Sequence, residues 1–254
     1  MRLLTFTQNF VEAVCGDLVD IVVLVPPGNS PANYEPTPQE VEHFNKSSLY
    51  FAIGVPTEAA NILPKATEIS TMKIVKLQEE VAKAYPDLEI SQGQRDQHIW
   101  LSPKRVMIMI ETIAHEMSLY DPNNKEIYES NAAAYIEELT RLDQELKESL
   151  QSVQNKKFIV FHPAFGYLAD DYSLQMYALE EGGKEATPQR LEEMIDLAKE
   201  EAIKAIFYQA EISSKQAESF AEEIGGKTIQ LAPLAPNYIE NLSNMAALMK
   251  EVME

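Results

Sequence analysis

Residues 161–172 read FHPAFGYLADDY, and they follow an apolar run, residues 158–161, that is typical of a buried strand. His162 lies where that strand would end, and residues 163–167 are compatible with a turn into a helix. Open α/β sheets bind their ligands at such junctions, beyond the carboxyl ends of the strands. His162 is therefore the first candidate for a binding residue.

Outward from this stretch, the second half of the chain alternates between strand-like and helix-like segments. Strands are expected at 158–161, 174–179, 205–208 and 228–231, and helices at 187–201, 213–224 and 237–253. Strands that alternate with helices favour a parallel sheet with right-handed crossovers. The fold class predicted for this half is α/β.

The first half carries the same kind of pattern. Strands are expected at 3–7, 19–25 and 49–53, and helices at 9–14, 58–63, 77–84 and from Pro103 onward. A further helix begins with Thr37 as N-cap, Pro38 at the first helical position and Glu40 completing a capping box. Pro64 and Pro86 are read as helix stops, and residues 91–97 as a polar loop.

Between the two halves, residues 121–153 predict one long helix. Apolar side chains recur at helical spacing without an internal glycine or proline, at Tyr128, Tyr135, Leu139, Leu142, Leu146, Leu150 and Val153. At about 1.5 Å per residue this helix would reach roughly 45 Å, which is longer than one small lobe needs. We therefore expect an N-terminal α/β lobe at 1–120, a rigid linking helix at 121–153 and a C-terminal α/β lobe at 154–254.

Composition narrows the function classes. The 254 residues include 40 acidic and 21 basic ones, a net charge of −19, which disfavours nucleic acid and anionic membranes as partners. Cys15 is the only cysteine, so an intramolecular disulfide and a cysteine metal cluster are both excluded. There is no apolar run long enough to span a bilayer and no signal-peptide pattern, so we expect either a cytoplasmic protein or one whose export segment is absent from this sequence.

Polar residues gather on the loops that would follow the strands. These are the loop 26–36, the turn at His162, residues 209–211 and residues 232–233, and His98 would join them from the loop before Pro103. With parallel strands such loops open on one side of a sheet. The other two histidines, His43 and His115, lie off the apolar faces of their helices and are predicted to be solvent-exposed.

Five segments together resemble a known family. They are GNSPANYEPTP (28–38), DQHIWLSP (96–103), the start of the predicted long helix (DPNN, 121–124, with Tyr128, Asn131 and Tyr135), FHPAFGYLADDY (161–172) and LAPLAPNYIENL (231–242). In order and spacing they resemble the zinc and manganese solute-binding proteins of ABC transporters, the TroA-like cluster A-I family, over nearly the whole chain. The resemblance implies two α/β lobes joined by a rigid helix, with one divalent metal ion held between them and passed to a membrane permease.

Further expectations follow from this resemblance. It implies a monomeric receptor, not an enzyme, that works outside the cytoplasm, in the periplasm or anchored to the cell surface by a lipid, after removal of a leader. It also implies only a small closure on ligand binding, because the linking helix is rigid. Surface adhesion on the same scaffold is a further possibility.

The resemblance also implies the metal ligands, and here this chain differs from the family. Two of the family's four metal ligands, both histidines, match His98 and His162. The positions of the other two ligands, a histidine and an aspartate, fall on Ala32 and Ala232, whose side chains cannot bind a metal. Zinc sites usually have four ligands, and manganese prefers oxygen donors. The candidate additional ligands are Gln209, Glu211 and Asn33, with Glu35 less favoured because it belongs to a capped turn.

Two other functions stay open at this stage. The two alanines leave room for a larger ligand, so the same receptor would bind a metal chelate or a small organic molecule. A hydrolase that uses His162 with Asp170 or Asp171 is disfavoured, because the sequence has no nucleophile elbow, no HExxH motif and no glycine-rich phosphate loop.

Overall fold

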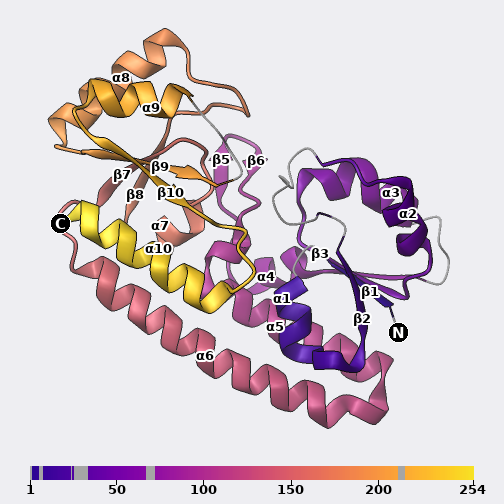
Figure 1. Cartoon of the computed structure of the whole chain (residues 1–254). Helices are drawn as coiled ribbons and strands as arrows, with labels where there is room; N and C mark the ends of the chain where they lie inside the picture. The colour runs from indigo at the N-terminus through magenta and orange to yellow at the C-terminus, as the bar shows by residue number, and fades with distance from the viewer. Residues whose placement is uncertain (1, 6–7, 24, 26–33, 67–71, 211–214) are drawn as a thin grey trace. The chain divides into compact units, whose positions relative to one another are not determined.

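The computed structural model describes residues 2–5, 8–23, 25, 34–66, 72–210 and 215–254. Its contacts divide the chain into two compact units, Met1–Asp87 with Pro103–Arg141, and Leu88–Ser102 with Leu142–Glu254. Each unit contains one four-stranded sheet with helices packed around it (Figure 1). The predicted α/β fold class, with a parallel sheet in each half of the chain and a long helix, is confirmed.

The sheet of the first unit has the strand order β2-β1-β3-β4, and all its strands are parallel. The strands are β1 (Arg2–Thr5), β2 (Asp20–Val23), β3 (Leu49–Ala52) and β4 (Lys73–Lys76). The α-helices are α1 (Gln8–Cys15), α2 (Pro38–Asn45), α3 (Leu63–Ala66), α4 (Leu77–Ala84) and α5 (Pro103–Tyr120), and short helical turns span Gly16–Leu18, Glu58–Ile62 and Pro122–Asn124. Strand β3 is buried at every position, as expected for a central parallel strand covered on both faces.

Helix α2 begins with the predicted capping box. The Thr37 hydroxyl accepts a hydrogen bond from the backbone N–H of Glu40 at 3.3 Å, and the Glu40 carboxylate accepts one from the backbone N–H of Thr37 at 2.7 Å. Two donors at the helix start are thereby satisfied by side chains. The prediction for this boundary is confirmed.

Three details of the first hundred residues differ from the prediction. Pro64 does not end a helix, because the π-helical turn Glu58–Ile62 leads directly into α3 and the helical segment continues past Pro64 to Ala66. Strand β4 has only four residues and runs directly into α4, so its pattern merges with that of the helix. Residues 91–97 are not all loop, since β5 (Glu89–Ser91) and β6 (Gln94–Arg95) form a hairpin whose connecting Gly93 has a φ of +76°.

The long helix α6 spans Lys125–Gln151 and follows the 3₁₀ turn Pro122–Asn124. Asp121 anchors this start, because its carboxylate accepts hydrogen bonds from Asn124 at 2.7 Å and from the hydroxyl of Tyr128 at 2.9 Å. The predicted apolar face is buried at Tyr128, Leu139, Leu142, Leu146 and Leu150, and Tyr135 is half-buried.

The division by contacts is drawn differently from the expected lobes. It falls within α6, between Arg141 and Leu142, and it assigns residues 88–102 to the second unit, although the expected N-terminal lobe, 1–120, included them. His98 therefore belongs to the same unit as His162.

The sheet of the second unit has the strand order β10-β9-β7-β8, again all parallel. Its strands are β7 (Lys157–Val160), β8 (Gln175–Ala178), β9 (Ala205–Gln209) and β10 (Lys227–Leu231), which confirms the four predicted strands. Its helices are α7 (Gly166–Asp171), α8 (Pro188–Glu200), α9 (Lys215–Glu223) and α10 (Tyr238–Met253), and a 3₁₀ turn spans Ile99–Leu101. Helices α8 and α9 cover one face of the sheet, and α10 covers the other (Figure 1).

A core cluster holds α8 and α9 against this sheet. It contains Ile159 and Ile206 from the strands, Met194 from α8 and Phe220 from α9, each at most 1% exposed. Burial of each such side chain is worth about 1.5–3 kcal/mol, so the edge of the sheet that carries His162 rests on a rigid base. In the described part of the chain, no helix combines the length and the apolar character needed to cross a membrane.

Candidate metal-binding site

His162 stands two residues beyond β7, and strand pairing gives it a carboxylate neighbour. Strands β7 and β8 pair Val160 with Ala178, and the backbone N–H of Glu180 donates to the carbonyl of Phe161 at 2.9 Å. The parallel ladder therefore continues past the named strands and brings Glu180 beside His162. The Glu180 carboxylate lies 2.9 Å from Nδ1 of His162.

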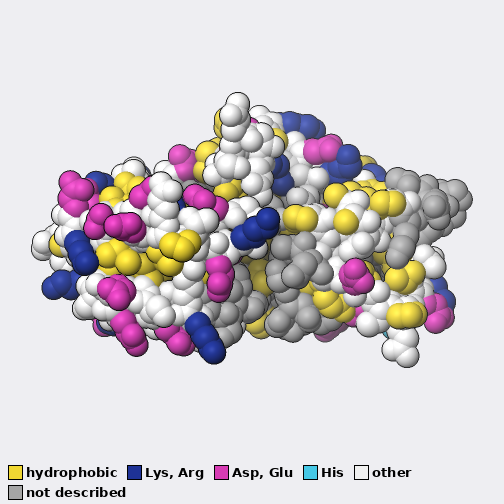
Figure 2. Space-filling model, turned by 90° about the horizontal axis from the view of Figure 1, so that it is seen from above, with side chains coloured by type: hydrophobic (Ala, Val, Ile, Leu, Met, Phe, Trp, Pro, Cys, Tyr) yellow, Lys and Arg dark blue, Asp and Glu magenta, His cyan; other side chains and the backbone are white. Residues whose placement is uncertain are grey.

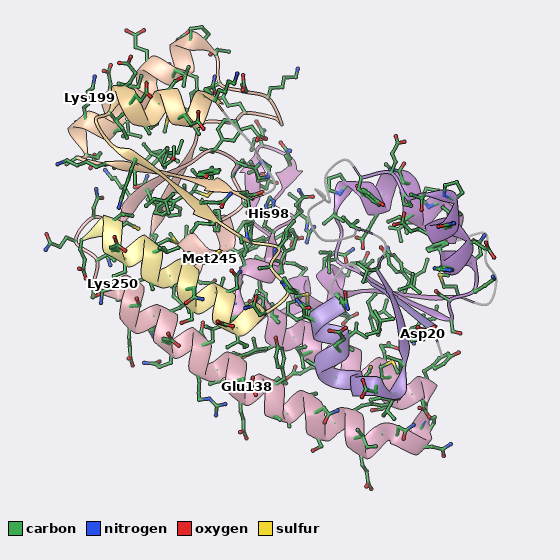
Figure 3. All side chains as sticks on the ribbon, in the orientation of Figure 1. Asp20, His98, Glu138, Lys199, Met245 and Lys250 are labelled. Atoms are coloured by element: carbon green, nitrogen blue, oxygen red, sulfur yellow. The ribbon has the colours of Figure 1, made fainter. Side chains whose placement is uncertain are left out.

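His98 reaches the same place from the segment after the hairpin β5–β6 (Figure 3). The backbone of Asp96, two residues earlier, is fixed at both ends: its N–H donates to the carbonyl of Leu88 at 2.7 Å, and its carbonyl accepts from the hydroxyl of Tyr167 at 2.9 Å. Tyr167 belongs to α7, which follows His162. This contact holds the two histidine-bearing segments together.

The two imidazoles face each other through their Nε2 atoms, which are 3.4 Å apart. The ring centroids are 5.3 Å apart, with an angle of 81° between the ring planes. On the far side of each ring, Nδ1 is bound by a carboxylate. An oxygen of Asp96 lies 2.7 Å from Nδ1 of His98, and an oxygen of Glu180 lies 2.9 Å from Nδ1 of His162.

This arrangement determines what the imidazoles can do. A carboxylate at Nδ1 accepts a hydrogen bond from the Nδ1–H group and so leaves Nε2 with a free lone pair, the form in which histidine binds metals. When both rings carry their proton on Nδ1, the two Nε2 lone pairs face each other at 3.4 Å and repel unless a cation, a proton or a metal ion, lies between them. Two nitrogen ligands of one tetrahedral zinc, at 2.0–2.1 Å from the metal, are about 3.3 Å apart. The His98–His162 pair therefore has the spacing of two ligands that share one metal ion.

Burial favours the neutral form of His98, which is 3% exposed. Desolvation lowers the pKa of His98 below its ordinary value, and the hydrogen bond to Asp96 acts in the opposite direction. A lowered pKa keeps the ring unprotonated, and only the unprotonated ring can bind a metal.

Two neighbours fix the His98 side of the pair. A Cβ atom at Gly166 would come within 2.4 Å of the Asp96 carboxylate, so any other residue there would have to displace that carboxylate. The Trp100 ring meets that of His98 edge to face, with centroids 5.2 Å apart, and its Nε1–H donates to the carbonyl of Pro233 at 3.1 Å. Trp100 thereby connects His98 to the loop that follows β10.

The other predicted ligands are placed less completely. Gln209 ends β9, is 8% exposed and pairs with Leu231 of β10, which puts it at the same edge of the sheet as His162. Ala232 is half-buried, and its carbonyl accepts a hydrogen bond from the side chain of Asn241 at 2.8 Å. Glu35 is exposed. Asn33, Glu211 and Ala32 lie outside the described residues.

Within the described ranges, no three histidine, cysteine, aspartate or glutamate side chains are grouped so that they could hold a metal ion. Asp96 and Glu180 bind the Nδ1 atoms of the histidines, on the side away from the facing Nε2 atoms. The described residues thus supply two imidazoles at the point where a metal ion would bind.

Reasoning from sequence missed Asp96 and Glu180. A signal for Asp96 was its place two residues before His98, within reach of the same ring. A signal for Glu180 was the parallel pairing of the strands predicted at 158–161 and 174–179, because each strand is followed by one of the two residues.

The other two histidines and the aspartates of the hydrolase alternative are not part of the His98–His162 pair. His43 and His115 are exposed, as predicted. Nδ1 of His162 pairs with Glu180, whereas Asp171 accepts a hydrogen bond from the hydroxyl of Ser102 at 2.5 Å. The structure therefore does not bear out a dyad of His162 with either aspartate, since its Nδ1 is bound to a different carboxylate.

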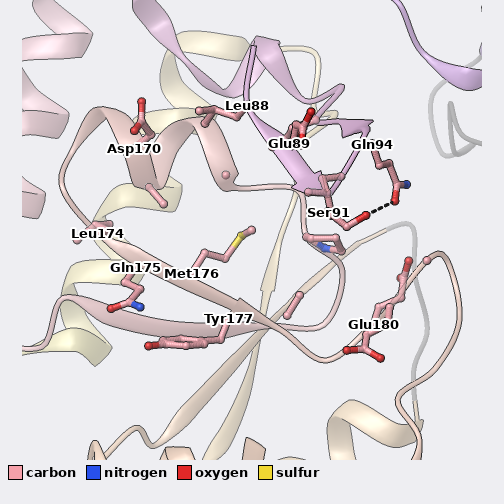
Figure 4. Close-up of a pocket in the computed structure, with 18 of the residues that line it drawn as sticks. Leu88, Glu89, Ser91, Gln94, Asp170, Leu174, Gln175, Met176, Tyr177 and Glu180 are labelled. Atoms are coloured by element: carbon pink, nitrogen blue, oxygen red, sulfur yellow. Dashed lines mark hydrogen bonds between the residues drawn. The ribbon is translucent and has the colours of Figure 1, made fainter. Parts of the chain in front are cut away.

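A pocket of about 750 Å³ lies behind the pair, within the second unit. Its wall is formed by the β5–β6 hairpin, α7 and β8 with the turn that follows it, and it includes both Asp96 and Glu180. Figure 4 shows Glu180 at one end of this pocket, with Met176 and Tyr177 of β8 along its wall.

The chain is similar to known proteins in sequence and in structure. The chain is similar to the zinc-binding lipoprotein AdcA of Streptococcus pneumoniae, with 31% identity over 245 residues, which are 89% of this chain and 48% of AdcA. It is also similar to the high-affinity zinc uptake system protein ZnuA of Bacillus subtilis, with 29% identity over 248 residues, 92% of this chain and 76% of that protein. A crystal structure of ZnuA superposes with a TM-score of 0.93 at 36% identity and covers 100% of this chain and 99% of its own.

The chain matches these relatives over different shares of their length. The chain spans about half the length of AdcA, at 48%. The expected kinship with zinc and manganese solute-binding proteins is confirmed. The sequence model of the ZnuA family, which is described as zinc-uptake complex component A, periplasmic, matches residues 4–252. The chain belongs to this family.

Proposed function

We propose that this chain is the substrate-binding component of an ABC transporter and that it carries a divalent metal ion bound by His98 and His162. One observation carries the proposal: the two Nε2 atoms are 3.4 Å apart while a carboxylate binds each Nδ1. The relatives support it, since they include a zinc-binding lipoprotein and a zinc uptake protein.

Zinc is the cargo that this ligand set favours. Imidazole nitrogen suits zinc, whereas manganese prefers carboxylate, carbonyl and water oxygens. We assign Gln209 as a further ligand through its amide oxygen, because it is buried at the edge of the sheet that carries His162. Water would complete the coordination shell.

The proposal includes the partner and the place of action. The receptor, a monomer, delivers its ion to a membrane permease from outside the cytoplasm, either free in the periplasm or held at the cell surface by a lipid anchor. Family membership supports this, because the family is described as the periplasmic component of a zinc-uptake complex.

Calorimetric titration tests the proposal. The purified protein is titrated with zinc and, separately, with manganese, and the titrations are repeated with His98→Ala, His162→Ala and His43→Ala. We expect zinc to bind more tightly than manganese, the first two variants to lose zinc binding, and His43→Ala to keep it, because His43 is exposed. No heat with either metal at micromolar protein would overturn the proposal.

A second candidate is that the ion arrives as a chelate. The presence of alanine at positions 32 and 232 favours it, because a metal with few protein ligands has open positions for another molecule. Native mass spectrometry of protein purified from its source distinguishes the two cases. A bound mass equal to one metal ion supports the bare ion, and a larger mass that contains the metal supports the chelate.

A further inference from the structure

The two carboxylates behind the histidines are held in different ways. Asp96 is 2% exposed, and one of its oxygens accepts from both the backbone N–H and Nδ1 of His98, at 2.9 and 2.7 Å. Its other oxygen faces Gly166, where no side chain would fit. Asp96 is thus held by contacts with its own segment and with α7. Its carboxylate accepts hydrogen bonds from both the backbone and the ring of His98.

Glu180 reaches His162 from a separate part of the fold. Its backbone is fixed on one side by the pairing of β8 with β7, and on the other by a tight turn in which Glu181 and Lys184 exchange two backbone hydrogen bonds of 3.0 and 3.1 Å. Gly182 and Gly183 have φ values of +58° and +78° in that turn, a conformation that favours glycine. The side chain of Glu180 is therefore presented from a rigid backbone, with 9% of its surface exposed.

Arg190 strengthens this support. Its guanidinium donates to the carbonyl of Ala178, the last residue of β8, at 3.2 Å. The end of β8 is thereby tied to the first turn of α8.

We infer that Glu180 is a positioning residue for the metal site: it selects the Nδ1–H tautomer of His162 and holds Nε2 of that ring toward His98. The position of a histidine proton is set by the hydrogen bond that the other nitrogen makes. Without Glu180, His162, whose side chain is 18% exposed, would be free to rotate and to carry its proton on Nε2, the atom that has to bind the metal. This inference rests on the proposed function for its effect on metal binding, but its effect on the tautomer can be measured without metal.

Removal of such a carboxylate partner typically weakens metal affinity roughly 10- to 100-fold. The pocket of about 750 Å³ that borders Glu180 adds a second consequence. If the carboxylate is removed by Glu180→Ala, a small carboxylate such as formate can enter from the pocket and take its place at Nδ1.

The variants are Glu180→Ala, Glu180→Gln and, as matched control, Glu181→Ala. Glu181 is the next residue on the same turn, but its side chain is 62% exposed and pairs with Arg190 rather than with a histidine. Glu180→Gln keeps an oxygen that can accept from Nδ1 and preserves the shape of the side chain. Thermal unfolding of each variant shows whether it is folded.

Two measurements are made on each protein. Nitrogen-15 NMR of the imidazoles identifies the tautomer of His162 in metal-free protein, and competition with a chelator gives the Kd for zinc. We expect Glu180→Ala to shift His162 toward the Nε2–H tautomer, to raise the Kd roughly 10- to 100-fold, and to recover part of this loss in formate. Glu180→Gln should retain the Nδ1–H tautomer with a smaller loss, and Glu181→Ala should match the wild type.

An unchanged tautomer and an unchanged Kd in folded Glu180→Ala would overturn the inference. If wild-type protein bound neither zinc nor manganese, the proposed function would fail, while the tautomer shift would still support the role of Glu180 in orienting His162. The two failures are therefore distinguishable.

Discussion

At the scale of single residues, the candidate site depends on the orientation of two imidazoles, that of the buried His98 and that of the half-buried His162. Burial lowers the pKa of His98, while Asp96 holds the ring in place through Nδ1 and through the backbone N–H. The burial that keeps His98 neutral also lowers the stability of the folded protein in acid, because protonation of a buried ring is unfavourable.

The first prediction concerns the pH dependence of stability without metal. His98 has a lower pKa in the folded protein than its ordinary value of 6.5, so below about pH 6.5 the unfolded chain binds more protons at this residue. The free energy of unfolding should therefore fall as the pH drops from 7 to 5, and His98→Gln should reduce the slope. Urea unfolding at several pH values measures both proteins, and parallel slopes would contradict the prediction.

The second prediction concerns Gly166. A methyl group at this position would lie 2.4 Å from the Asp96 carboxylate, so Gly166→Ala has to displace Asp96 and with it His98. We expect a loss of about 1–3 kcal/mol in stability, as for other overpacked sites, together with weaker zinc binding.

Gly225→Ala is the control for that variant. Gly225 has a φ of +62°, but a Cβ there would meet no atom within 4 Å. This variant should lose stability through backbone strain while its zinc affinity stays unchanged. Equal zinc affinity in Gly166→Ala and wild type would show that Asp96 does not transmit the displacement.

At the scale of elements, the first unit has a buried carboxylate at the end of β3. Glu58 is 1% exposed and accepts hydrogen bonds from the hydroxyl of Tyr50 at 2.6 Å and from the backbone N–H groups of Ile53, Gly54 and Val55 at 3.1, 2.6 and 3.0 Å. It satisfies the donors that the strand leaves at its carboxyl end, so it is a structural group.

The third prediction follows from this network. Glu58→Ala leaves several buried donors without an acceptor, each at a cost of about 1–3 kcal/mol, so we expect a total loss of about 3 kcal/mol or more. Glu58→Gln keeps one acceptor oxygen and should lose less. Chemical denaturation measures both variants, and a loss below about 1 kcal/mol in Glu58→Ala would show that water replaces the carboxylate.

Elements with a strong local signal were predictable from sequence. The four strands of the second sheet are apolar runs between turn residues, and α6 keeps an apolar face over 27 residues without glycine or proline. The hairpin β5–β6 was not predictable in this way, because its strands have three and two residues and only Ile90 is apolar. A short strand is stabilised by its partners rather than by its own pattern.

The site shows the same distinction. His98 and His162 could be named from their positions and from the family resemblance. Glu180 could not, because it becomes a neighbour of His162 only through the pairing of β7 and β8, which links residues 18 apart in the chain. Gly166 has no visible role until the carboxylate of Asp96 is placed against it.

At the scale of the whole molecule, the chain carries a net charge of −19. On the face shown in Figure 2, acidic side chains lie among basic and apolar ones and do not form a single patch.

The central claim is that one metal ion is shared by His98 and His162. X-ray absorption spectroscopy of the zinc-loaded protein tests it most directly, since it reports how many imidazole rings surround the metal. We predict two imidazole ligands with nitrogens at about 2.0–2.1 Å from zinc in the wild type, and at most one such ligand in His162→Ala. A spectrum without imidazole scattering, or one left unchanged by His162→Ala, would contradict it.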